Sequence, residues 1–198
     1  IIWAGCIISS PVRRNMNYHN ITYPDQNNGD GLRVVVWVSG CSHHCSECQN
    51  PQTWNPHGGI EFNNDAEQEV MDQISKDYIS GITWSGGDPM FESNIETVLD
   101  ITQKIKKQYP NKTIWLYTGY KFEQLIWPVI TGDFNPERDK RLKQTRKLIS
   151  LCDVIVDGRY KKELRDVSLH WCGSSNQRVI DVQKTLAQNK IILYEDNK

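Results

Sequence analysis

"LRVVVWVSGCSHHCSEC", residues 32–48, joins two patterns that decide the fold of this 198-residue chain. Residues 32–38 form a nearly continuous apolar run rich in β-branched side chains, which is typical of a strand buried on both faces of a parallel sheet. Cys41, Cys45 and Cys48 follow directly after this run. The stretch therefore predicts a buried parallel strand whose carboxyl end leads into a cysteine-rich loop.

Helical and extended segments alternate along the rest of the chain. Apolar side chains recur at helical spacing in residues 64–78, where Tyr78 closes the pattern, in 93–110 and in the short segment 122–127. Short apolar runs predict strands over residues 81–87, 112–120, 152–158, 178–182 and 190–194. Residues 131–150 are polar and charged, so we expect a solvated loop and an exposed helix there. This alternation predicts βαβ units, a mostly parallel sheet and right-handed crossovers.

The distinctive residues fall just after four of the predicted strands. The cysteines follow the first strand, and "SGGDP" (85–89), "TGY" (118–120) and "DGRY" (157–160) follow the next three. In α/β folds the loops converge at the carboxyl ends of parallel strands. We therefore expect one site built from four loops.

The composition of the chain limits which partners and which domain organisation are expected. Apolar residues make up 38% and charged residues 24%, and the net charge is −1, so nothing attracts nucleic acid or an anionic membrane in general. No run approaches the roughly 20 apolar residues of a membrane span. We expect a single domain over residues 16–198 and an N-terminal extension over 1–15 outside it, with Met16 as a candidate native start. The alternative is that residues 1–15 add a strand to the domain.

The cysteine cluster allows two kinds of metal site. Structural zinc takes four ligands, and a fourth from His43 or His44 in the same short loop would be cramped. Three thiolates can instead hold three irons of a cubane and leave the fourth iron open. Three of the six cysteines lie within eight residues, which indicates metal ligation in a reducing compartment, and so a cytoplasmic protein. A non-catalytic zinc module that binds a partner stays as the alternative.

Six motifs in order resemble those of the radical S-adenosylmethionine enzymes. They are similar in particular to the activating enzymes of anaerobic ribonucleoside-triphosphate reductase, and the similarity runs from about residue 16 to 181. The motifs are "NGDGLRVVVWVSGC" (28–41), "CQNPQTWNP" (48–56), "SGGDPMF" (85–91), "WLYTGY" (115–120), "DVIVDGRY" (153–160) and "GSSNQRVID" (173–181).

The resemblance implies a partial, open (βα) barrel and a [4Fe-4S] cluster. Cys41, Cys45 and Cys48 match the iron ligands, and the open iron would be chelated by the amino and carboxylate groups of S-adenosylmethionine. Reductive cleavage of that molecule would give a 5′-deoxyadenosyl radical that abstracts hydrogen from a glycine Cα of the reductase. The resemblance implies no catalytic group beyond the cluster and S-adenosylmethionine.

Further residues match cofactor-binding positions of the family. Gly86, Gly87 and Asp88 match the turn that cradles the methionine amino group. Glu47 and Gln49 flank Cys48 where relatives contact adenine or ribose, although Glu47 departs from the small or aromatic residue common there.

Thr118 and Gly119 are weaker candidates for lining the cofactor pocket. Asp157 is either a site residue or the cap of a turn. His43 and His44 are expected to be exposed loop residues.

Three further features are a glycine-rich segment before the first strand and two single cysteines. The Asn-Gly-x-Gly-x-Arg segment, Asn28, Gly29, Gly31 and Arg33, either shapes the lip of the site or forms a hairpin-like turn. Cys172 stands where the family tends to have arginine, and we expect a buried or idle thiol, with an extra metal ligand as the alternative. Cys152 opens a buried strand and is expected in the core.

The resemblance also implies partners. These are the glycyl-radical subunit of anaerobic ribonucleoside-triphosphate reductase and an electron donor such as flavodoxin, with no nucleic acid and no membrane. Another radical S-adenosylmethionine enzyme, such as a pyruvate formate-lyase activase or a small-molecule modifier, is the competing assignment.

Overall fold

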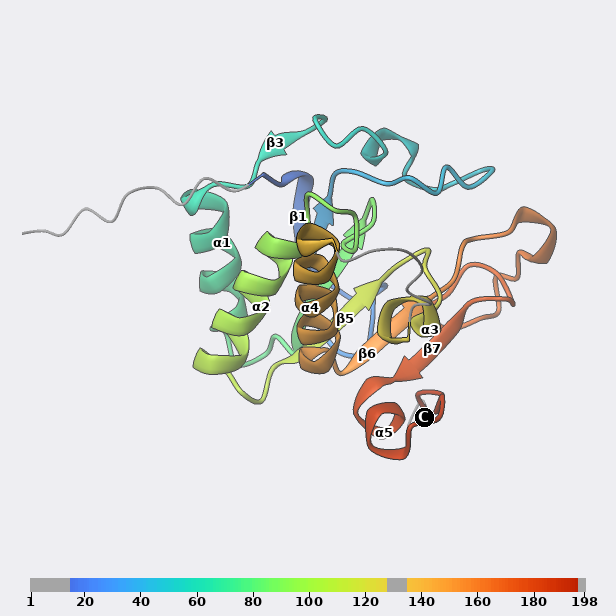
Figure 1. Cartoon of the computed structure of the whole chain (residues 1–198). Helices are drawn as coiled ribbons and strands as arrows, with labels where there is room; N and C mark the ends of the chain where they lie inside the picture. The colour runs from blue at the N-terminus through green and yellow to red at the C-terminus, as the bar shows by residue number, and fades with distance from the viewer. Residues whose placement is uncertain (1–14, 128–134, 196–198) are drawn as a thin grey trace, which may run out of the picture.

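Seven strands form one sheet in the order β3-β1-β2-β4-β5-β6-β7. A computed structural model describes residues 15–127 and 135–195 of the chain (Figure 1). The strands are β1 (Asn17–Asp25), β2 (Arg33–Val38), β3 (Ile60–Glu61), β4 (Gly81–Gly86), β5 (Thr113–Tyr117), β6 (Val154–Asp157) and β7 (Arg178–Asp181). The four central strands β2, β4, β5 and β6 run parallel, whereas β1, β3 and β7 pair antiparallel at the two sides. Over the described residues the sheet is therefore open, and the predicted parallel arrangement is confirmed for its centre.

Five α-helices and two 3-10 turns complete the described part of the chain. The helices are α1 (Asn64–Ile74), α2 (Ile95–Gln108), α3 (Phe122–Ile126), α4 (Pro136–Leu151) and α5 (Val182–Gln188), and the turns are η1 (Pro51–Thr53) and η2 (Lys162–Leu164). Figure 1 shows α1, α2 and α4 side by side on the same side of the sheet. Asn63, Asn135 and Asp181 each cap a helix by accepting a backbone N–H in its first turn.

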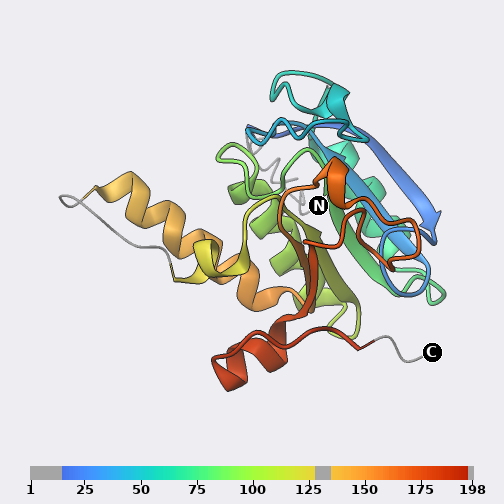
Figure 2. The same cartoon turned by 90° about the vertical axis from the view of Figure 1, so that its right-hand side faces the viewer.

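The two faces of the sheet carry different residues because side chains alternate along a strand. One face carries Val34, Val36, Ile82, Trp84 and Ile114, which belong to the main core under the helices. The other face carries Trp115, Val154 and Val156, a smaller cluster packed against Tyr117, Trp171, Cys172, Val179 and Tyr194. Loops cover this second face: the segment after β6, orange in Figure 2, lies toward the viewer over the strands. A sheet with helices on one face and loops on the other leaves room for a cavity on the loop side.

Several predicted elements differ from the structure. The first helix ends at Ile74, and Tyr78 lies beyond it with 56% of its surface exposed, so its place in the helical pattern was wrong. Residues 190–194 are not a strand: Leu193 forms a single bridge with Ile180. Strand β1 and helix α5 were not predicted.

Helix α4 begins in the polar segment 131–150, as expected, ends at Leu151, and has no buried residue in its first half. Its last turns bury Thr145, Leu148 and Ile149, so this end belongs to the core. Residues 131–134 of that segment and residues 1–14 lie outside the described part of the chain, and the expectation for the N-terminal extension stays a prediction. Among the described residues no helix is both long and apolar enough to cross a membrane.

Candidate functional site

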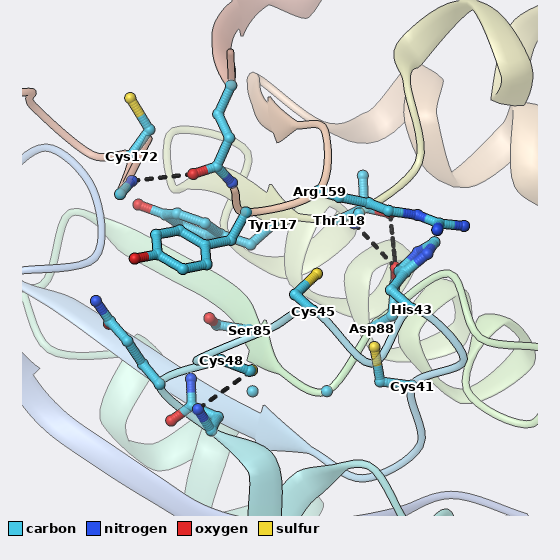
Figure 3. Close-up of a pocket in the computed structure, with 18 of the residues that line it drawn as sticks. Cys41, His43, Cys45, Cys48, Ser85, Asp88, Tyr117, Thr118, Arg159 and Cys172 are labelled. Carbon is cyan, nitrogen blue, oxygen red and sulfur yellow. Dashed lines mark hydrogen bonds and ion pairs between the residues drawn. The ribbon is translucent and has the colours of Figure 1, made fainter. Parts of the chain in front are cut away.

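A cavity of about 360 Å³ opens at the carboxyl ends of the parallel strands. This volume lies in the range of small-molecule sites. Its lining includes residues from all four predicted loops: Cys41, Cys45 and Cys48 after β2, Gly86–Asp88 at the end of β4, Thr118 and Gly119 after β5, and Gly158–Tyr160 after β6. Figure 3 shows the three cysteines together with Asp88, Thr118 and Arg159 around this space. The structure thus brings the four loops to one place.

Residues 39–50, which carry the three cysteines, form the cluster loop. Backbone N–H groups surround the thiols of this loop. Burial raises the pKa of the Cys41 thiol to about 11, although hydrogen bonds from the backbone N–H groups of His43 and His44 favour its thiolate. Burial also raises the pKa of Cys45, against a hydrogen bond from the backbone of Tyr160. Cys48 Sγ accepts a bond of 3.4 Å from the backbone N–H of Asn50. Backbone N–H groups of this loop and of the loop after β6 therefore donate to all three sulfurs, and such hydrogen bonds tune the thiolate ligands of iron–sulfur clusters.

Asp88 is the most densely bonded side chain of the cavity. It is 1% exposed. Its carboxylate accepts from His43 Nε2 at 2.8 Å, from the backbone N–H of Met90 at 2.8 Å and of Gly119 at 3.0 Å, and from Thr118 Oγ1 at 3.0 Å. All of these donors belong to the protein. Asp88 therefore joins the loops after β2, β4 and β5.

His43 is buried, so the expectation that it is an exposed loop residue was wrong. Its side chain is 3% exposed, and its ring packs edge-on against Tyr120 with 4.5 Å between ring centroids. Gly119 makes this position available, because a Cβ there would lie 2.6 Å from His43 Nε2 and 2.7 Å from its Cγ. His44 is exposed as expected, and its ring contacts Trp54.

The two glycines before Asp88 allow a close approach of backbone to backbone. Gly86 has φ +97°, and a Cβ on it would lie 2.8 Å from the backbone of Trp37 and Val38. A Cβ on Gly87 would lie 2.6 Å from the carbonyl oxygen of Gly40. These glycines line the cavity, and they also let the turn pack directly on the exit of β2.

Glu47 is the predicted site residue that lies apart from the rest. It is absent from the cavity lining, its side chain is 56% exposed, and it forms an ion pair with Lys162. Gln49, on the other side of Cys48, does line the cavity. The structure therefore separates these two predicted adenine contacts.

Asp157 and Arg33 hold the fold together rather than face the cavity. Asp157 is 1% exposed, accepts from the first backbone N–H of α3 and forms an ion pair with Arg178. Arg33 is fully buried, and its guanidinium donates to Thr83 Oγ1 and to backbone and hydroxyl oxygens on neighbouring segments. Thr83 in turn donates to the carbonyl of Asn28, which lines the cavity. The segment 28–33 thus lies in the connection between the antiparallel strands β1 and β2, as the hairpin alternative predicted, and Asn28 also lines the cavity while Arg33 supports it from inside.

Cys152 is buried in the core, as predicted. Cys172 is half-buried and lines the cavity, and the expectation that its thiol is idle stays a prediction.

Several residues that line the cavity were not predicted from the sequence. Trp37, Ser85 and Tyr117 lie on strands, at positions whose side chains face the loop-covered side of the sheet. Trp171 and Gln177 come from the segment between β6 and β7. The alternation along β2, β4 and β5 was the signal that could have identified the first three.

The fold and the cysteine-lined cavity define a class of protein, an α/β iron–sulfur domain. Consistent with this class, residues 27–180 match the family model described as a 4Fe-4S single cluster domain. A protein of Enterobacteria phage T4 is 40% identical over 83% of this chain and 93% of its own length. Proteins of Haemophilus influenzae and Escherichia coli K12 are 37% and 36% identical over 82% and 83% of this chain, and over 96% and 97% of their own lengths. All three are named anaerobic ribonucleoside-triphosphate reductase-activating protein, and this chain belongs to that family.

Proposed function

We propose that this protein activates an anaerobic ribonucleoside-triphosphate reductase by radical S-adenosylmethionine chemistry. Cys41, Cys45 and Cys48 would hold a [4Fe-4S] cluster. When bound, the cluster supplies the electron that cleaves S-adenosylmethionine to methionine and a 5′-deoxyadenosyl radical. That radical would take a hydrogen atom from a glycine Cα of the reductase, which gives 5′-deoxyadenosine and a glycyl radical.

One observation carries the proposal: three thiols line one cavity at the ends of the parallel strands, and each accepts a backbone N–H. A cubane with three protein thiolates has one iron left for an exchangeable ligand. The family membership supports the same reading, because the relatives are named for activating this reductase. The open sheet, with helices on one face and loops over the other, supports a partial (βα) barrel of the radical S-adenosylmethionine type.

Three cysteines fit a cluster better than structural zinc. Structural zinc takes four protein ligands, whereas a cubane held by three thiolates leaves one iron for an exchangeable ligand.

S-adenosylmethionine would occupy the rest of the cavity. Gly86, Gly87 and Asp88 would form the wall at its methionine end, and Gln49, Thr118 and Gly119 line the same space. The chain itself contributes position and exclusion of water, and it holds the thiols in place by backbone hydrogen bonds. Because sulfur ligands of this kind need a reducing environment, we place the protein in the cytoplasm, with a donor such as flavodoxin supplying electrons.

Anaerobic reconstitution tests the proposal directly. The wild-type chain should bind about four irons and form 5′-deoxyadenosine when given dithionite and S-adenosylmethionine. Added to the reductase, it should give the doublet of a glycyl radical in electron paramagnetic resonance spectra. Pyruvate formate-lyase in place of the reductase should give no such signal.

Two cysteine variants sharpen the test. Cys45→Ala should lose the intact cluster and all cleavage, whereas Cys172→Ala, which removes a thiol from the same cavity, should keep the iron content of the wild type. Zinc without iron in the reconstituted wild type, or equal iron loss in both variants, would contradict the assignment of the ligands.

A further inference from the structure

The contact between His43 and Asp88 fixes the middle of the cluster loop. The two side chains are 3% and 2% exposed, and His43 Nε2 lies 2.8 Å from Asp88 Oδ2. At this distance the imidazole nitrogen and the carboxylate oxygen share one hydrogen bond. His43 lies midway between Cys41 and Cys45, and its own backbone N–H and that of His44 point at the Cys41 sulfur. Holding the imidazole in place therefore also holds the donors of one thiol.

The start of the loop is fixed by other contacts. At its start, the backbone N–H of Asp88 donates to Gly40 O at 2.8 Å, and Asn94 Nδ2 links Ser39 O to Asp88 O. Also at its start, the backbone N–H of Cys41 donates to Trp54 O at 3.1 Å. In the interior of the loop, the side chain of His43 makes the buried contact with Asp88, which lies just after β4.

The carboxylate of Asp88 already has hydrogen-bond donors from the protein on both oxygens. Both of its oxygens accept hydrogen bonds from buried protein donors, supplied by His43, Met90, Thr118 and Gly119. A ligand ammonium that bound the carboxylate would have to displace at least one of these donors and leave it unpaired in a buried place, which is unfavourable. The carboxylate is therefore better suited to hold the loop than to bind the cofactor directly.

We propose that His43 is a positioning residue and that His43 and Asp88 form a buried strut that holds the cluster loop against β4 and β5. This inference rests on the proposed function. It assigns Asp88 a different task from the ammonium-binding role that the sequence resemblance implies. Gly119 and Thr118 belong to the same strut, because one gives the ring its space and the other completes the carboxylate's bonds.

The test compares His43→Ala, His43→Gln and Asp88→Asn with the wild type and with His57→Ala, which truncates an exposed histidine outside the cavity. The first measurement is the rate at which a ferrous chelator removes iron from reconstituted protein in the absence of S-adenosylmethionine. We expect about 10–100-fold faster loss in His43→Ala and Asp88→Asn, as for other groups that orient metal ligands. His43→Gln keeps a side-chain N–H donor and should recover part of the stability, and His57→Ala should match the wild type.

Steady-state kinetics separate the strut from direct cofactor binding. If Asp88 is part of the strut, Asp88→Asn and His43→Ala share one phenotype, with kcat lowered and KM for S-adenosylmethionine within about twofold of wild type. A large rise in KM in Asp88→Asn with normal iron retention, together with a His43→Ala variant that behaves like wild type, would overturn the proposal.

A measurement on the metal-free protein tests the His43–Asp88 strut separately from the proposed function. In the apo-protein, mass spectrometry follows the alkylation rate of Cys41, which should rise about tenfold or more in His43→Ala because the loop opens locally. If the wild type binds no cluster, the proposed function fails, and this rate still decides the strut. An unchanged alkylation rate would overturn the strut alone.

Discussion

Replacing Gly119 with alanine should remove the buried His43–Asp88 contact without touching either residue. The added Cβ would lie 2.6 Å from His43 Nε2 and 2.7 Å from Cγ, and closer still to Cδ2. Carbon atoms settle at about 3.5–4.0 Å, so the ring must move by about 1 Å. That shift carries Nε2 beyond hydrogen-bond range of Asp88, from which it is now 2.8 Å away. The backbone of Gly119 is not in the left-handed region, so the ring is the main obstacle.

The expected cost is about 2–4 kcal/mol in the free energy of unfolding, the sum of a lost charge-assisted hydrogen bond and local overpacking. Urea denaturation of the apo-protein measures it, with Gly173→Ala as the control, because there the nearest atom is a Tyr160 ring carbon at 3.3 Å. In a His43→Ala background the space is empty, and Gly119→Ala should then cost at most about 0.5 kcal/mol. Additive costs in the double variant would refute the reasoning.

Three further outcomes follow from the geometry. Arg33→Met should destabilise the apo-protein by about 3–5 kcal/mol in urea denaturation, since it leaves several buried oxygens without a donor; a loss below 1 kcal/mol would contradict this. Glu47→Gln should change stability by less than about 0.5 kcal/mol, because its pair with Lys162 is exposed, and should leave KM for S-adenosylmethionine unchanged; a several-fold rise would place Glu47 at the cofactor. The ion pair with Arg178 lowers the pKa of Glu123 to about 2 from 4.5, so wild type should exceed Glu123→Gln in thermal stability above pH 4.5 and lose that advantage as the pH falls toward 2. An advantage that persists at pH 2 would contradict the assignment.

The centre of the sheet was predictable because its strands are apolar on both faces. Strand β2 is buried along its whole length except at Trp37, which is half-buried, and β4 and β6 are buried in a similar way. In the sequence each of these strands is therefore a short apolar run between polar loops. Strand β1 gave no such signal: in "NYHNITYPD" only Ile21 is buried. Its place at the side of the sheet comes from pairing with β2, which no local pattern encodes.

The C-terminal region shows how a β-branched run can mislead. Residues 190–194 have strand composition, yet only Leu193 makes a bridge. The helix before it carried usable signals, because Asp181 caps its first turn and Asn189 ends it in the left-handed conformation. The cap at Asp181 was not recognised because residues 178–182 have a strong strand pattern.

The sequence was enough to predict which loops form the candidate site. It was not enough to predict what each side chain in those loops does. Parallel strands bring their carboxyl ends together, so Cys41, Gly87 and Thr118 had to be neighbours once the strand order was known. The side to which a loop residue turns depends on backbone conformation, which the sequence does not state. His44 and Glu47 both have positive φ, 45° and 54°. His43 turns inward and Glu47 is exposed.

The same contact that positions the loop also limits the ligands available to a metal. A histidine beside three cysteines is, by composition, a candidate fourth ligand for zinc. In this fold His43 Nε2 is bonded to Asp88 and its ring is enclosed between Gly119 and Tyr120. The other histidine of the loop, His44, packs on Trp54. The contact with Asp88 therefore removes Nε2 from the possible metal ligands, whereas Nδ1 of His43 is buried and has no hydrogen-bond partner among the described residues.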